Sequence, residues 1–156
     1  MPEVQARGLI EMMSHAHPSS RLEACLLPQS WKRSTLKHLA IDDIVVFPTK
    51  EAKVVLLDEA DNVVSCGRYG LLRDLPSILI EEGRDDTWSH IDSKKYRSLK
   101  VSLGTISSPA PERGEILSLE REGGCEAILY RERRLLACAD LVQLDGHLAL
   151  HIREVV

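Results

Sequence analysis

The sequence predicts an all-β fold with a minor helical part, built from two similar units. Short segments rich in branched apolar residues recur between turn-forming residues, as in strands, and the apolar pattern of residues 41–82 returns at 113–154 with an offset of 72 and no gap. Because strand side chains alternate between faces, a slip of one residue would scramble such a match. An internal duplication in a short chain indicates two like units packed on each other.

Six aligned pairs are identical, and the apolar positions coincide along the stretch. The identical pairs are Ile44/Ile116, Leu57/Leu129, Cys66/Cys138, Leu72/Leu144, Ile80/Ile152 and Glu82/Glu154. In the same alignment Val55, Leu56 and Leu57 fall on Ala127, Ile128 and Leu129. Upstream, the segment 22–26 matches 99–103 at an offset of 77, so the first unit carries five extra residues before its core block.

The first unit is expected at 21–84, after an N-terminal tail or linker at 1–20. Its branched apolar runs predict strands at 22–27, 44–47, 53–58, 62–66 and 77–81. A short helix is expected within 31–39. In the tail, Val4, Leu9, Ile10, Met12 and Met13 would suit one face of a short helix, but short terminal segments are often disordered, and we expect the latter.

A polar linker at 85–96 is expected to lead into the second unit at 97–156. Strands are predicted at 99–103, 116–119, 126–130, 135–138, 141–144 and 147–153. The dipeptide Asp145-Gly146 between two alternating segments indicates a two-residue hairpin. In the last strand Leu148, Leu150 and Ile152 would share one face, with His147 and His151 on the other. The prolines within 107–111 rule out a counterpart of the helix.

Composition limits the possible roles. A unit of about 60 residues is marginal on its own, so the two units are expected to share a core. The net charge of −4 and the aromatic content of 4% argue against nucleic-acid binding. No apolar run is long enough for a membrane span and no signal peptide is recognisable, so we expect a cytoplasmic protein without direct membrane insertion. The four cysteines form no CxxC pair and are expected to be reduced packing residues.

No pattern of residues predicts catalysis. The chain lacks phosphate-binding glycine loops, nucleophile elbows and zinc-binding HExxH motifs. On a strand His147 and His151 would be about 13 Å apart, too far for one metal ion. The pairs Asp42-Asp43 and Glu81-Glu82 lie beside turns, where carboxylates usually stay solvated. We therefore expect no catalytic residue, no metal site and no cofactor.

The second unit closely resembles the SpoA (surface presentation of antigens) domain. The resemblance rests on the motif Leu99-Lys-Val-Ser-Leu-Gly104, the strand entry Arg113-Gly-Glu-Ile-Leu-Ser-Leu119, the segment 127–130, the small-residue step in 134–142 and the ending Gly146-His-Leu-Ala-Leu-His-Ile152. SpoA domains occur in the flagellar switch proteins FliM and FliN and in the YscQ/HrcQ/SpaO proteins of type III secretion. The first unit matches more weakly, chiefly through the internal repeat. Two departures are a missing helix after Leu-Gly in the second unit and the absence of the large N-terminal region usual in YscQ-type proteins.

The resemblance implies two SpoA-like small β barrels, paired as an intertwined intramolecular pseudo-dimer. It implies a non-enzymatic building block of the type III secretion cytoplasmic ring or sorting platform, peripheral to the membrane-embedded apparatus. The implied partners are the stator protein (YscL/HrcL-like) that links the ring to the secretion ATPase, and other copies of the ring protein or free SpoA domains. The partner-binding patch of such domains maps onto Leu141, Val142 and Gln143, with Tyr69, Gly70 and Leu71 at the equivalent positions of the first unit.

Other interpretations stay open at this point. The six mapped residues would equally suit a core strand. A flagellar motor switch component (FliM/FliN-like) is one alternative, and a small two-lobed β-barrel enzyme with a site between the repeats is another. An inter-repeat cleft that collected several ionisable side chains would favour the enzyme. The sequence does not reveal stoichiometry, the register of a bound stator peptide, or whether the chain is part of a longer protein.

Overall fold

The computed structural model describes residues 21–27, 30–47, 49–81, 95–108, 110–121 and 124–156. The expected tail 1–20 lies outside these residues, as does most of the expected linker 85–96. The described chain forms one ten-stranded antiparallel sheet, one two-stranded sheet and a helix of 5 residues. The predicted all-β class is therefore confirmed.

The first repeat contains β1 (Arg21–Leu26), β2 (Ser30–Lys32), α2 (Arg33–Lys37), β3 (Ile44–Val46), β4 (Lys53–Leu57), β5 (Val63–Leu72) and β6 (Leu75–Glu81). The second contains β7 (Tyr96–Ser98), β8 (Lys100–Ser107), β9 (Ile116–Ser118), β10 (Ala127–Arg131), β11 (Arg134–Leu144) and β12 (His147–Val155). Tyr96, expected at the end of the linker, thus begins a strand. That strand pairs with β2 in the small sheet.

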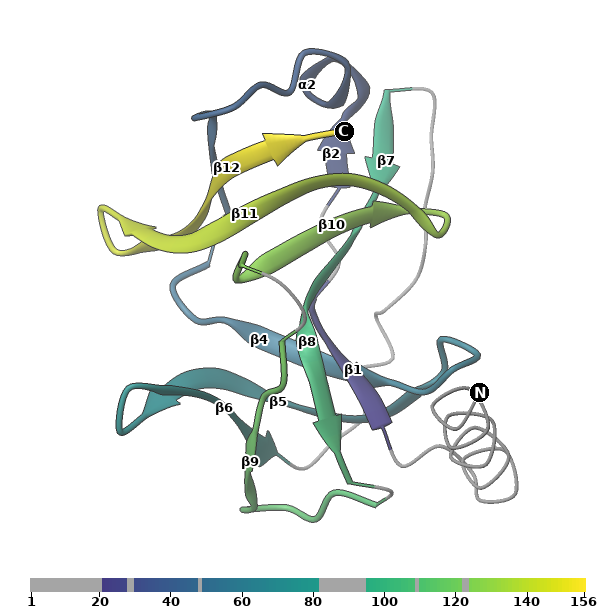
Figure 1. Ribbon diagram of the computed structural model, residues 1–156, viewed down its shortest axis with the longest axis vertical. Coiled ribbons are helices and arrows are strands. Elements are labelled where there is room, and N and C mark those ends of the chain that lie inside the picture. Colours follow the sequence, from purple (N-terminus) through teal and green to yellow (C-terminus); the bar gives the residue numbers. More distant parts are fainter. Residues whose placement is uncertain (1–20, 28–29, 48, 82–94, 109, 122–123) are drawn as a thin grey trace, which may run out of the picture.

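The strand order of the large sheet reads the same from both ends once the repeat is taken into account. The order is β3-β12-β11-β10-β8-β1-β4-β5-β6-β9, in which β3 corresponds to β9, β12 to β6, β11 to β5, β10 to β4 and β8 to β1. Figure 1 shows β10–β12 above and β4–β6 below, and in the strand order β8 and β1 connect these two groups. The two repeats are therefore related by an approximate twofold arrangement within one sheet.

Each repeat lends one strand to the other. The first repeat's β3 pairs with β12, where Val45 lies opposite Leu150, and the second repeat's β9 pairs with β6, where Leu117 lies opposite Ile78. The two registers are identical at the offset of 72, and the flanking hydrogen bonds repeat as well. Completion of either half of the sheet therefore requires both halves of the chain.

The offset of 72 holds for most strands but is wrong for one pair. The equivalent residues Cys66 and Cys138 lie opposite Val55 and Ile128, so β4 and β10 correspond at an offset of 73. The gapless alignment fails because the connection before β5 is longer than the two-residue turn before β11. Both faces of β4 are apolar and buried, so the residues of β4 show no alternation that would reveal a shift of one position.

The hairpins are longer than expected. One strand, β11, replaces the two predicted at 135–138 and 141–144, and β5 and β6 run on to a two-residue turn at Arg73-Asp74. Both turn residues have positive φ, 52° and 65°, as Asp145 and Gly146 do at the predicted turn of the second repeat. The Arg-Asp turn lacks the Asn-Gly or Asp-Gly signature, which explains why sequence patterns missed it.

The main apolar core joins the two repeats. Its largest cluster takes side chains from β1, β4 and β6 of the first repeat and from β8, β10, β11 and β12 of the second. The motif residue Gly104 lies at a close approach of the chain to itself: its φ is +132°, and a Cβ there would lie 2.4 Å from the carbonyl oxygen of Glu120. Residues Glu120 and Thr105 form an isolated bridge at this crossing.

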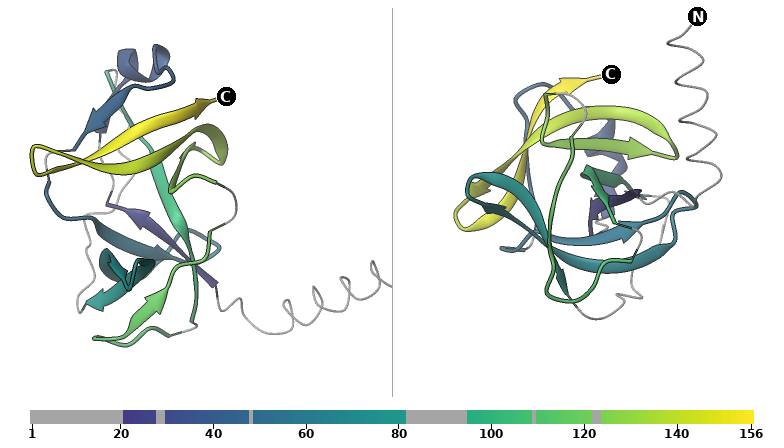
Figure 2. Two further views of the ribbon diagram at one scale, coloured as in Figure 1. Left: turned by 60° about the vertical axis from the view of Figure 1, so that its left-hand side comes forward. Right: turned by 60° about the horizontal axis from the view of Figure 1, so that its bottom comes forward.

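The strand pairing does not form two closed barrels. Within the described residues β3 and β9 end the sheet and do not pair with each other. The Thr105–Glu120 bridge brings the chain after β9 back to β8 without a further ladder. The architecture is thus an open, strongly curved sheet in which the two repeats exchange strands, as the two views of Figure 2 show.

The expectation that all cysteines are reduced is wrong for two of them. A disulfide joins Cys125 to Cys138 on β11, whereas Cys25 and Cys66 are thiols. No spacing pattern predicted this bond, because the two cysteines are separated by 13 positions and form no short motif. For Cys25, burial and then the charge of Glu23 raise the pKa of the thiol well above its usual value.

Candidate docking surface

The six sequence-predicted residues occupy equivalent positions on two hairpins. Tyr69, Gly70 and Leu71 lie opposite Ile78, Ser77 and Pro76, while Leu141, Val142 and Gln143 lie opposite Leu150, Ala149 and Leu148. Both hairpins project toward the same side of the molecule, at the left of Figure 1. The structure therefore brings both triplets to one side of the molecule, on separate hairpins.

Neighbouring residues within each triplet point to opposite faces of their strand. On β5, Tyr69 is half-buried and packs on the core, Gly70 is exposed, and Leu71 is 64% exposed near the hairpin tip. On β11, Leu141 packs on the core and Val142 is half-buried. The triplets are thus partly core strand and partly surface, and Leu71 is their most exposed apolar side chain.

Tyr69 is held by a residue of the other repeat. The guanidinium of Arg121 donates a hydrogen bond from Nη2 to the Tyr69 hydroxyl at 2.9 Å and lies 5.7 Å from the centre of the ring. Its Nε donates to the Leu103 carbonyl oxygen, 3.4 Å away, and its Nη1 lies 3.9 Å from the Glu126 carboxylate. Arg121 therefore connects the loop after β9 to one of the predicted partner-binding residues.

An exposed apolar strip on the face of the β5–β6 hairpin opposite to Leu71 was not predicted from the sequence. Leu72 and Leu75 face each other across the β5–β6 turn, and Leu79 lies opposite Ile116 of β9, with exposed fractions of 49%, 62%, 40% and 51%. All four positions fall on the face that also carries Gly70. The missed turn at 73–74 hid this pattern, because without it the alternation through β5 and β6 is not visible.

The second repeat carries a more polar version of the strip. The equivalent positions hold Leu144, His147, His151 and Ile44. The His151 Nε2 lies 2.9 Å from Asp42 Oδ1, and His147 Nδ1 lies 3.2 Å from the Asp145 carbonyl oxygen. The two otherwise similar hairpins therefore differ chiefly in the character of this face, which is more apolar on β5–β6.

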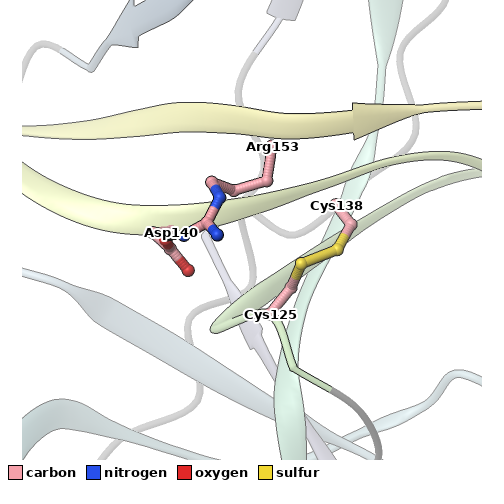
Figure 3. Close-up of a disulfide and its surroundings, with 4 residues drawn as sticks. All are labelled: Cys125, Cys138, Asp140 and Arg153. Atoms are coloured by element: carbon pink, nitrogen blue, oxygen red, sulfur yellow. Dashed lines mark hydrogen bonds and ion pairs between the residues drawn. A yellow bond between two sulfur atoms is a disulfide. The ribbon is translucent and has the colours of Figure 1, made fainter. Parts of the chain in front are cut away.

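A cross-strand ion pair flanks both surfaces with its charges reversed. On the first repeat Arg68 pairs with Glu81 at 3.2 Å, and on the second Asp140 pairs with Arg153 (Figure 3). These are equivalent positions at the offset of 72. Each pair is partly solvent-exposed and contributes modestly to stability. The reversal gives the two hairpins different charge patterns for a partner to distinguish.

A cavity of about 520 Å³ lies between the repeats and collects ionisable groups. It is lined by Glu23 and Asp61 from the first repeat and by Lys100, Tyr130 and Arg133, among others, from the second. The Lys100 ammonium contacts the carboxylates of Glu23 and of Asp61, the latter at 3.1 Å. Burial alone would lower the pKa of Lys100, but the hydrogen bond and charge of Glu23, aided by Asp61, raise it.

Comparison with known proteins assigns no family. No protein-family model matches the sequence, and no curated protein matches it significantly. Within the described residues no cluster of three or more His, Cys, Asp or Glu side chains could hold a metal ion. In that same part of the chain, no helix has the length and apolar character needed to cross a membrane.

Proposed function

We propose that this protein is a non-enzymatic structural component of the type III secretion cytoplasmic ring, which docks the stator protein of the secretion ATPase. In this proposal the two repeats are SpoA-like units that form an intertwined pseudo-dimer. The protein acts in the cytoplasm, peripheral to the membrane-embedded apparatus, and also assembles with other copies or free SpoA domains. A flagellar switch component follows from the same resemblance and would share this architecture.

The observation that carries the proposal is the reciprocal exchange of β3 and β9. Intertwined pairing is what the SpoA resemblance implies, and here the same register appears on both sides of the exchange. The motif glycine gives further support, because Gly104 permits the close crossing with Glu120 that brings the chain after β9 back to β8. Both features follow from residues on which the resemblance rests.

The proposed docking surface is the outward part of the two hairpins. It comprises Val142 and the apolar strip of Leu72, Leu75, Leu79 and Ile116, which lie on equivalent faces of the two hairpins, together with Leu71, which lies on the opposite face of β5 near the hairpin tip. Exposed apolar side chains on neighbouring strands suit the apolar face of a partner segment. A protein that acts by assembly requires a surface of this kind.

The test is the affinity for the soluble N-terminal segment of a YscL/HrcL-type stator protein, measured by isothermal titration calorimetry. Val142→Asp and Leu71→Asp are each expected to weaken binding more than tenfold, or about 1.4 kcal/mol. Because Val142 is half-buried, circular dichroism and thermal unfolding are measured on the same samples. Leu71 is 64% exposed, so its substitution tests the surface with little risk to the fold.

Val155→Asp is the matched control. Val155 is 40% exposed on β12 but lies at the opposite end of that strand from the hairpin turn. The same charge introduced there is expected to leave the affinity unchanged. Folded Val142→Asp and Leu71→Asp proteins with wild-type affinity would refute this docking surface.

A second candidate function is an enzyme with its site between the repeats. The inter-repeat cavity favours it, since it brings Glu23, Asp61, Lys100 and Arg133 together. Against it, the Lys100 ammonium is already neutralised by two carboxylates and its pKa is raised, the opposite of a catalytic amine. A panel of small charged metabolites tests the cavity: a substrate should raise the unfolding midpoint of the wild type but not of Arg133→Ser.

A further inference from the structure

The disulfide lies close in sequence to Arg121, which contacts the first repeat. Cys138 lies on β11, and Cys125 lies just before β10, in the loop that begins at Arg121 after β9. Figure 3 shows the bond beside the Asp140–Arg153 pair. The first repeat has a thiol, Cys66, at the position equivalent to Cys138, so the covalent anchor is specific to the second repeat.

Arg121 contacts a residue beside the disulfide and a residue of the first repeat. Its guanidinium pairs with Glu126, the residue that follows Cys125. It also donates a hydrogen bond to the Tyr69 hydroxyl on β5 and lies over the Tyr69 ring. Arg121 thus lies between Tyr69 and the residue that follows Cys125. The disulfide and Tyr69 belong to different repeats, so this contact couples the two halves of the molecule.

We propose that Cys125 and Cys138 form a reversible oxidation site that holds Arg121 against Tyr69. In the forward step two thiols lose their protons and one sulfur–sulfur bond forms, while two electrons and two protons pass to a small-molecule disulfide such as oxidised glutathione, which becomes two thiols. A dithiol reductant reverses the step. Both cysteines are partly exposed, so exchange with such partners is sterically possible.

The compartment proposed for this protein gives the bond a regulatory character. Disulfides in a reducing cytoplasm are usually transient, and they are then catalytic or redox-sensing. The regulatory character of the bond and its link to partner docking rest on the proposed function, whereas the presence of the bond does not. Because Arg121 covers the Tyr69 ring while the bond is intact, reduction is expected to uncover the ring and to strengthen docking about fivefold or more.

The experiment uses the full chain labelled with 3-fluorotyrosine and equilibrated in glutathione mixtures of rising oxidised fraction. Alkylation and mass spectrometry give the fraction of Cys125–Cys138 disulfide, and ¹⁹F NMR follows the three tyrosines. The Tyr69 resonance is expected to shift in step with the disulfide fraction, while Tyr96, in the small sheet, serves as the reference. Dithiothreitol should return it to its starting position.

Matched variants identify the residues responsible. Cys125→Ser should fix the Tyr69 resonance at its reduced position in every mixture, and Arg121→Ala should abolish its response. Cys66→Ser should leave the response intact. Thiols that stay reduced in fully oxidised glutathione, a disulfide that withstands dithiothreitol in the folded protein, or a Tyr69 resonance that ignores the disulfide would each overturn the proposal.

Affinity for the stator segment, measured in the reduced and oxidised states, separates this inference from the proposed function. Tighter binding to the reduced protein supports both. Equal binding in both states overturns the coupling to docking but supports the docking role. Binding in neither state overturns the docking role. The ¹⁹F response then shows independently whether Cys125 and Cys138 form a reversible oxidation site.

Discussion

Single glycines mark the places where backbones pass closest to each other. At Gly104 a Cβ would lie 2.4 Å from the Glu120 carbonyl oxygen, and at Gly67 it would lie 2.4 Å from the Leu79 carbonyl oxygen. Gly70, only three residues from Gly67, has nothing within 4 Å of such a Cβ. Two glycines on one strand thus serve different purposes, since only the first is required by packing.

Gly104→Ala is expected to destabilise the protein by about 2–3 kcal/mol, because an alanine cannot adopt a φ of +132° without strain and its methyl group would displace the Glu120 carbonyl. Gly70→Ala is the matched control and is expected to change stability by no more than about 0.5 kcal/mol. Urea unfolding followed by circular dichroism measures both. Equal stabilities of the two variants would contradict the role assigned to the crossing.

Two-residue turns set the register of the hairpins that carry the proposed docking surface. Arg73-Asp74 and Asp145-Gly146 both have positive φ at each turn residue, the geometry in which Asn and Gly are preferred. Arg73 adopts this conformation against its preference. The first hairpin is therefore stabilised by strand pairing more than by its turn residues, whereas the second hairpin also has a favourable turn sequence.

Arg73-Asp74→Asn-Gly is expected to stabilise the protein by about 0.5–1 kcal/mol, because both new residues accept positive φ more readily. The converse change, Gly146→Ala, is expected to cost about 1 kcal/mol at a φ of 77°. Thermal and urea unfolding give the two differences. A loss of stability in the Asn-Gly variant would show that the Arg73 or Asp74 side chain has a role the backbone angles do not reveal.

Sequence patterns predicted most strands and the repeat, but not the contacts between repeats. The offset of 72 placed β3, β5 and β6 correctly onto β9, β11 and β12, because turn positions and apolar alternation are local signals. It misplaced β4 by one residue, because a strand buried on both faces has no alternation. The contact of Arg121 with Tyr69 joins residues 52 positions apart, and the separation of 13 between Cys125 and Cys138 matches no short cysteine motif, so no local pattern indicated either contact.

At the scale of the whole molecule, the exchange of β3 and β9 determines how the chain must fold. Residues of both repeats fill one core, and the pair β1–β8 at the centre of the sheet also joins the two halves. Many of these contacts join residues distant in sequence. The chain therefore loses conformational entropy in bringing them together before the contacts stabilise the fold. The natural folding unit is therefore the complete pair of repeats.

The two repeats are expected to unfold as one cooperative unit, and neither half should fold alone. Segments 1–86 and 87–156, expressed separately, should be poorly folded or self-associated, because each lacks the lent strand and the central pairing of β1 with β8. Mixing them should restore a 1:1 complex with the circular dichroism spectrum of the intact chain. The control is intact protein cleaved after folding at a protease site inserted between residues 86 and 87, which should remain associated on size-exclusion chromatography. Two independent melting transitions in the intact chain, each retained in its isolated half, would mean that the exchanged strands are dispensable and that each repeat completes its own sheet.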